Sequence, residues 1–334
     1  MSQLLMSFLS LLLLGGTSLL ADPATEQGVF EYRLNNYPRQ TGDCHDVAAR
    51  LGNRFGTASG KEVVQAICVS ETDAEWDFLI RYRSDKAVTP VSTLPRYFGV
   101  APGGRFKDRQ ACEDQLSGLV AEFEAATELT ATISYCGRVL ASSRYPYAAR
   151  IDSFGEPKLS PVISSYLIFG VPKGITGAEY EERLRNSLES KGAQFSGFVI
   201  HSNIAYASVV VHYYAKEKLK FEMLEYTKTD TAAQCFLQVK ELENIFADTA
   251  NPPALVNCGY VHVGGQSEVN ALFIGEIPLR NRMAIEKFNS FNACSAERDR
   301  LVNHYKNTLG QDIRGGLCSR QKMGRQYQVV LFEP

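Results

Sequence analysis

The eight cysteines are the most reactive side chains of this sequence, and they form four pairs of nearly constant spacing. Structural zinc sites use cysteines separated by two to four residues, and thiol redox centres use C-x-x-C, whereas no two cysteines here are that close. An even number of cysteines in an exported chain favours disulfides. We therefore predict one disulfide within each pair, whose partners lie 24, 24, 23 and 24 positions apart: Cys44 and Cys68, Cys112 and Cys136, Cys235 and Cys258, and Cys294 and Cys318.

Each cysteine pair frames the same pattern of residues. A leucine stands seven positions after each first cysteine and an aromatic residue eleven positions after it: Leu51, Leu119, Leu242 and Leu301, and Phe55, Phe123, Phe246 and Tyr305. A spacing of four places the leucine and the aromatic residue on one face of a helix. One β-rich run precedes each helix and two follow it, so each unit reads β-α-β-β. The disulfide would join the start of the helix to the second strand and raise the free energy of unfolding by about 3 kcal/mol.

A fifth unit, residues 163–217, has the same order of elements and no cysteine. Aligned on Leu184 and Leu188, it places Gly177 and His201 where the other units have cysteines. His201 then has two interpretations. It is a ligand or acid-base group in a pocket left by the missing disulfide, or it is a buried side chain that fills the space of a cysteine, which we favour.

The sequence predicts an α+β protein: a tandem array of five βαββ modules, each a three-stranded sheet plus one helix, four of them cross-linked by a disulfide inside the module. Topology rules favour a third strand that lies between the first two and runs antiparallel to both. The predicted boundaries are residues 1–21 for a signal peptide, 22–87 for module 1, 88–153 for module 2, 154–162 for a linker, 163–217 for module 3, 218–277 for module 4 and 278–334 for module 5.

The first 21 residues read as a secretory signal peptide. An apolar run of the length of an h-region, from Leu4 to Leu14, is followed by Gly15-Gly16 and ends in the small residue Ala21. The run is short for a membrane span, which needs about 20 apolar residues, although an uncleaved N-terminal anchor is the alternative. We expect an exported chain that is periplasmic or extracellular.

Composition and motifs exclude several function classes. The 334 residues are 45% hydrophobic and 22% charged, with a net charge of −2, so the whole chain lacks the basic footprint of a nucleic-acid-binding protein. The sequence has no G-x-S-x-G, H-E-x-x-H or G-x-x-x-x-G-K-[ST] motif. We therefore predict no catalytic, cofactor-binding or metal-binding residues, and no cofactor.

Two groups of basic residues are candidates for binding an acidic partner. Arg105 and Lys107 follow a glycine-rich stretch before a predicted helix, where an anion could bind, although solvated side chains on a connecting loop are the commoner case. The last module has ten Lys or Arg against six Asp or Glu, a net charge of +4 for residues 276–334. Much of this charge lies in two short stretches that contain Arg280, Arg282, Arg320, Lys322 and Arg325.

Aromatic residues are the second candidate surface. Sixteen Tyr and eighteen Phe accompany a single Trp, and many lie on predicted strands, among them Tyr32, Tyr213, Tyr214 and Tyr327. Strand alternation would place about half of them on the sheet face away from the helix. They form either an exposed aromatic face for protein or sugar contact, or packing in the cores and between modules.

These observations favour a non-enzymatic, exported repeat protein that acts as a binding or scaffold module. Repetition of one cross-linked unit builds an extended surface, which suits recognition or assembly. We expect the partner to be a protein, with a glycan or an anionic envelope surface as alternatives. A structural subunit that self-associates through the edges of its modules is the second hypothesis. A hydrolase with its site in the cysteine-free third module is the third.

Overall fold

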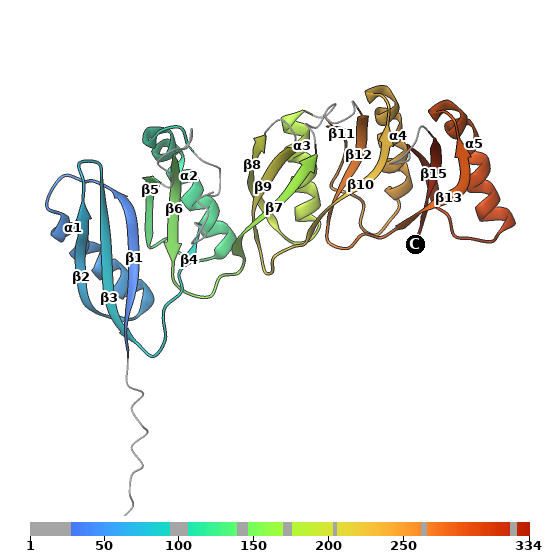
Figure 1. Cartoon of the computed structure of the whole chain (residues 1–334). Helices are drawn as coiled ribbons and strands as arrows, with labels where there is room; N and C mark the ends of the chain where they lie inside the picture. The colour runs from blue at the N-terminus through green and yellow to red at the C-terminus, as the bar shows by residue number, and fades with distance from the viewer. Residues whose placement is uncertain are drawn as a thin grey trace, which may run out of the picture.

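The computed structural model describes residues 28–93, 106–138, 146–169, 176–202, 206–261, 266–320 and 326–334. It contains five three-stranded sheets, each with one helix, which follow one another in a row from module 1 at the blue end to module 5 at the red end (Figure 1). In every sheet the third strand lies between the other two and pairs antiparallel with them. The predicted α+β class, the five βαββ modules and the strand order are confirmed. The signal peptide lies outside the described residues.

The first two modules differ in their first strands. Module 1 has a long first strand, whereas the described part of the first strand of module 2 has only two residues. The elements of the two modules are β1 (Gly28–Pro38), α1 (Cys44–Ser59), β2 (Glu62–Glu71) and β3 (Glu75–Ser84), then β4 (Val91–Ser92), α2 (Arg109–Thr127), β5 (Ile133–Arg138) and β6 (Tyr147–Ser153).

The last three modules follow without a break in pattern, and in module 5 a π-helical turn, η1 (His304–Thr308), continues the helix. Module 3 has β7 (Ser160–Phe169), α3 (Gly177–Glu189), β8 (Gln194–Ser202) and β9 (Tyr206–Ala215). Module 4 has β10 (Phe221–Thr229), α4 (Ala232–Phe246), β11 (Leu255–Val261) and β12 (Gln266–Ile274). Module 5 has β13 (Arg280–Phe288), α5 (Phe291–Asn303), β14 (Gly315–Arg320) and β15 (Tyr327–Glu333).

Each helix begins at a side-chain cap, and each predicted disulfide is present. The side chains of the five capping residues accept a hydrogen bond from a backbone N–H in the first turn, which satisfies a donor that the helix itself leaves unpaired. The caps are Asp43, Asp108, Thr176, Thr231 and Ser290. The four disulfides join Cys44 to Cys68, Cys112 to Cys136, Cys235 to Cys258, and Cys294 to Cys318. Each disulfide therefore fastens a helix to the second strand of its own sheet.

Neighbouring modules share their hydrophobic cores. The helix of a module covers the inner face of its sheet, and the opposite, outer face packs on the preceding module. Tyr135 belongs to the core of module 1, Tyr214 to that of module 2, Leu255 and Leu272 to that of module 3, and Phe332 to that of module 4. The tyrosines expected on an aromatic face are thus packing residues: Tyr32, Tyr213, Tyr214 and Tyr327 are all buried.

The segment expected to be a linker between modules 2 and 3 takes part in this packing. The ring of Phe154 lies 5.0 Å from that of Phe55 in the core of module 1. Strand β7 begins at Ser160, inside the same segment. The first two modules are therefore joined by an apolar contact as well as by chain connectivity.

The outer sheet face of module 1 has a different composition. No described residue covers this face, and it presents ion pairs between Arg33 and Glu31 at 2.9 Å, Arg81 and Glu31 at 3.3 Å, and Arg83 and Glu62 at 3.7 Å. Terminal units of repeat proteins need a polar outer face for solubility. Module 1 therefore has the character of a terminal cap.

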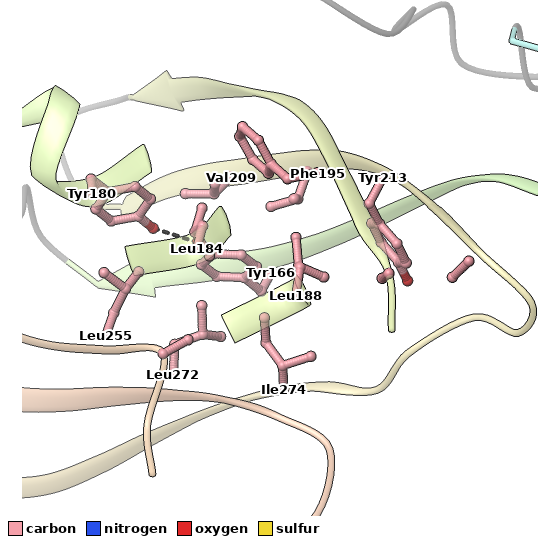
Figure 2. Packing of buried hydrophobic residues seen from close by; sticks show 14 residues of the cluster. Tyr166, Tyr180, Leu184, Leu188, Phe195, Val209, Tyr213, Leu255, Leu272 and Ile274 are labelled. Carbon is pink, nitrogen blue, oxygen red and sulfur yellow. Dashed lines mark hydrogen bonds between the residues drawn. The ribbon is translucent and has the colours of Figure 1, made fainter. Parts of the chain in front are cut away.

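The cysteine-free module 3 has a different connection between helix and sheet. The hydroxyls of Tyr180, on α3, and Tyr166, on β7, share a hydrogen bond inside the core (Figure 2). Burial is the main reason that the pKa of both hydroxyls lies above its ordinary value, so both stay protonated at neutral pH. The tyrosine pair thus fastens α3 to the first strand, where the other modules use a disulfide to the second.

We expect Tyr180→Phe to lower the free energy of unfolding by about 1–3 kcal/mol, because it leaves the buried hydroxyl of Tyr166 without a partner. Urea denaturation followed by far-UV circular dichroism measures the loss. Tyr226→Phe is the matched control, since the buried hydroxyl of Tyr226 has no hydrogen-bond partner among the described residues. Equal losses in the two variants would contradict a role for the hydrogen bond.

Candidate functional site

The joint between modules 1 and 2 combines a buried ionic network with two open clefts. It forms where β1 meets β5 of the next sheet. The β1–β3 register shifts between Leu34 and Tyr37, and this bulge holds Asn36 at a φ of 55°. Asparagine adopts such a left-handed conformation more readily than most residues. The bulge turns the backbone oxygen of Asn35 and the side-chain amide of Asn36 outward, toward module 2.

Module 2 meets the bulge with hydrogen bonds. The Tyr135 hydroxyl donates to the backbone oxygen of Asn35 at 2.8 Å, and the Asn36 side-chain amide donates to the backbone oxygen of Arg138 at 2.5 Å. The Arg150 guanidinium donates to the backbone oxygen of Arg33 at 3.2 Å. Bulges commonly redirect a strand edge for such contacts, so β1 is shaped for docking.

A buried ion pair lies at the centre of the joint. Arg150 Nε lies 2.7 Å from Asp152 Oδ2, with side-chain exposures of 16% and 0%. The Tyr32 hydroxyl of module 1 donates to the same carboxylate oxygen, and Arg150 Nη1 donates to the Tyr135 hydroxyl at 3.2 Å. The guanidinium also lies 5.7 Å from the Tyr32 ring centre and 5.9 Å from that of Tyr135. This set of four residues is called the joint network below.

Three members of the joint network, Tyr32, Tyr135 and Arg150, keep their protons at neutral pH. Burial raises the pKa of Tyr135 to about 12, and burial together with the Asp152 charge holds the pKa of Tyr32 well above its ordinary value. Burial opposes the charge of Arg150, but Tyr135, Asp152 and Tyr32 outweigh it and raise the pKa of the guanidinium. Both hydroxyls therefore remain donors, and the arginine remains a cation.

A polar cleft of about 480 Å³ opens beside the joint network. It is lined by residues 38–42 and 73–75 of module 1 and by Arg109, Cys136 and Tyr147 of module 2. Its charged lining residues are Arg39, Arg109, Asp73 and Glu75, two of each sign. Burial raises the pKa of Glu75, and the backbone N–H and the charge of Arg138 partly offset this shift. We call this space the polar cleft.

Arg39 is the more available of the two cations in the polar cleft. Its nitrogens lie 3.8 Å from Glu71 and 3.7 Å from Asp73, beyond hydrogen-bond distance, and its guanidinium lies 5.9 Å from the Trp76 ring centre. Arg109, in contrast, has its Nε only 2.6 Å from Glu113. A ligand would therefore meet Arg39 with little competition.

A larger and more open groove of about 820 Å³ lies at the other end of the joint. Residues of α1, among them Asn53, Arg54 and Thr57, form one wall, and Thr130, Thr132 and Phe154 form the other. The lining is polar apart from Phe154 and Ala residues. The joint between modules 1 and 2 thus has an accessible recess at both ends.

His201, the candidate from module 3, does not join His212 at a common site. His201 lies on β8 opposite Ser208, and His212 lies on β9 opposite Gly197. Ser208 and His212 are four residues apart along β9, or about 13 Å. Val211 and Tyr213 point into the core of module 3, so His212 points to the outer face, toward module 2.

The basic candidates that lie among the described residues do not form one patch. Arg105, Lys322 and Arg325 lie outside the described residues, and Lys107 is exposed next to the cap of α2. Arg280 is exposed at one end of the sheet of module 5, opposite Glu333, whereas Arg320 lies at the other end, opposite Tyr327. These two positions are six residues apart along β15, or about 20 Å.

Two of these arginines have structural partners. Arg320 forms an ion pair with Asp230, which also accepts a hydrogen bond from the Tyr327 hydroxyl, so it fastens module 5 to module 4. Arg282 lies 3.3 Å from Glu333 and 5.0 Å from the centre of the Tyr305 ring. The guanidiniums of Arg320 and Arg282 are therefore already engaged by other residues of the protein.

Sequence reasoning did not find the joint network or the polar cleft. The one available signal was Asn35-Asn36 inside a strand-like run, which is typical of a bulge or turn. Cys44, Cys68 and Glu71 also lie close together, but both sulfurs belong to the disulfide and offer no thiolate to a metal.

No protein-family model, curated protein or solved structure matches this chain. The four disulfides indicate an oxidising, extracytoplasmic environment. Across the described ranges, none of the helices has the length and apolar character needed to cross a bilayer.

Proposed function

We propose that this chain is an exported, non-enzymatic scaffold, periplasmic or extracellular, that binds another protein at the polar cleft between modules 1 and 2. The observation that supports this most is the cleft itself, whose walls come from two modules held together by the joint network. A site between rigid units is preorganised, which reduces the entropy lost on binding.

The charges of the polar cleft favour a protein over a polyanion. Two guanidiniums and two carboxylates give its lining no net charge. A peptide segment offers amides, cations and anions together and can satisfy both signs, whereas an anionic glycan or envelope surface would meet Asp73 and Glu75 as repulsive groups. Among the described residues the lining includes neither a histidine nor a free thiol, so it offers no histidine-activated nucleophile of the Ser-His or Cys-His kind.

A photo-crosslinking amino acid in place of Thr41, which lines the polar cleft, tests the proposal in the native cell envelope. We expect one discrete protein adduct, and we expect Arg39→Ala to weaken binding of that protein about tenfold through loss of a charge-assisted contact. The same probe in place of Lys240, an exposed residue on α4, is the matched control. The same adducts from both positions, or none from position 41, would refute the site.

A further inference from the structure

The four joints of the array differ in how much apolar core they share. At three of them, the following module contributes several buried residues to the core of the preceding one: Ile133 and Tyr135 to module 1, Ala254, Leu255, Leu272 and Ile274 to module 3, and Leu279, Leu317, Val330 and Phe332 to module 4. Among the described residues, module 3 contributes only Tyr214 to the core of module 2. The joint between modules 2 and 3 therefore has the least shared apolar packing.

The same joint lacks the ion pairs that reinforce the others. The joint network holds modules 1 and 2 together. Arg183 lies 2.7 Å from Glu243 across modules 3 and 4, and Arg320 pairs with Asp230 across modules 4 and 5. Within the described part of the chain, no ion pair joins module 2 to module 3.

Buried polar groups without partners lie on the face that module 3 presents to module 2. His212 and Tyr214, next but one to each other on β9, are each 1% exposed. Both ring nitrogens of His212 and the hydroxyl of Tyr214 lack a hydrogen-bond partner in the described structure. A buried polar group without a partner costs free energy, which hydration recovers. Opening of this joint therefore costs less than its buried area alone would indicate.

The chain crosses this joint at a single short point. The backbone N–H of Lys158 donates to the oxygen of Thr127 at 2.9 Å, and its Nζ lies 2.6 Å from Glu128, so the chain is attached to module 2 as far as Lys158. Strand β7 of module 3 begins at Ser160. Only Leu159 lies between the two attachments. The strands also meet differently here, because β4 lies against the first strand of the next module, β7, whereas β1 and β10 lie against second strands, β5 and β14.

We propose that the array divides at Leu159 into two lobes, modules 1–2 and modules 3–5, and that each lobe unfolds as one unit without the other. In a repeat protein the joints couple neighbouring modules, so the weakest joint sets the boundary between cooperative units. The lobe with the polar cleft then stays folded when the cysteine-free module 3 opens. This division does not depend on what the polar cleft binds.

Hydrogen exchange followed by mass spectrometry tests this division on the full, disulfide-bonded wild-type chain. In rising but subdenaturing urea, the slowest amides of modules 1 and 2 should converge on one free energy of opening, and those of modules 3–5 on another. A single value shared by all five modules would overturn the proposal. Five separate values, one for each module, would overturn it as well.

Two variants each perturb one lobe and serve as controls for one another. Asp152→Ala should lower the protection of modules 1–2 at least about a hundredfold and leave modules 3–5 within about twofold of the wild type. Tyr180→Phe should lower the protection of modules 3–5 about tenfold and leave module 2 unchanged.

The outcome is decisive even if one variant unfolds its own lobe. Modules 1–2 without protection in Asp152→Ala, beside modules 3–5 with wild-type protection, would support the division directly. A loss of protection that spreads from module 2 into module 3, or from module 3 into module 2, would overturn it. A loss in Tyr180→Phe that stops within module 3 would overturn the grouping of modules 3–5.

Discussion

Asp152→Ala is expected to lower the free energy of unfolding of modules 1 and 2 by about 3–5 kcal/mol, because it leaves the buried guanidinium of Arg150 without a counter-charge. The Tyr32 hydroxyl loses its acceptor in the same variant. Trp76, the single tryptophan of the chain, is fully buried in module 1. Its fluorescence during urea denaturation therefore reports on this part of the array, while circular dichroism reports on all five modules.

Removal of both charges separates the ion pair from the packing around it. Arg150→Met with Asp152→Leu replaces the pair by apolar side chains of similar size, and such replacements are often neutral or stabilising. We expect the double variant to recover most of the loss. A double variant as unstable as Asp152→Ala would mean that the shape of the site matters more than its charge.

A surface pair supplies the matched control, and because it lies outside module 1 its effect is followed by circular dichroism. Arg185 and Glu181 on α3 lie 2.8 Å apart with exposures of 42% and 45%. Glu181→Ala should cost less than about 1 kcal/mol, because solvent screens an exposed pair. A loss below about 1 kcal/mol in Asp152→Ala as well would contradict the view that the joint network holds modules 1 and 2 together.

The modules could be predicted from the sequence because their defining contacts are short-range and repeated. Cys112 and Leu119 lie on one helix, and the disulfide partner Cys136 is 24 positions away. Four copies of one spacing also excluded most of the possible disulfide connectivities. The antiparallel order of the strands followed from the same local pattern and general topology rules.

The joints were not predictable by the same reasoning. Tyr32 and Asp152 are 120 positions apart, and nothing in either unit indicates the other. Arg150 and Asp152 alternate with apolar residues on β6, the pattern of a strand with one face in solvent. That face is instead covered by module 1, so the charges are buried and paired.

In module 5, described basic residues that are close together in the sequence are not close together in the structure. Arg320 appears beside other basic residues in the chain, yet its charge is engaged by Asp230 of module 4. The sequence does not predict that Ile285 is exposed, since one apolar residue in a strand normally indicates a core position. The bulge, which depends on the register with β15, turns it outward.

His212 is expected to contribute a loss of about 3 kcal/mol in the free energy of unfolding as pH decreases from above 6.5 to below 4. Both ring nitrogens of His212 lack a hydrogen-bond partner in the described structure, and burial lowers its pKa from 6.5 to about 4. Between these values the unfolded chain binds a proton that the folded chain does not. Stability from His212 is therefore fully present above pH 6.5 and is lost progressively as pH falls through 4.

His212→Leu should remove this part of the pH dependence, and urea denaturation at intervals between pH 7 and 4 measures it. His45→Leu is the matched control, because the His45 side chain is 76% exposed. Glu122 acts in the opposite direction: burial raises its pKa, so it stabilises the fold at low pH. The comparison must therefore be made between variants. Identical pH profiles for wild type and His212→Leu would show that protonation of His212 does not lower the free energy of unfolding. Such a result would require a hydrogen-bond acceptor for the protonated ring, or a path for solvent, on the outer face of module 3. The expected difference would instead establish that this face is sealed against module 2.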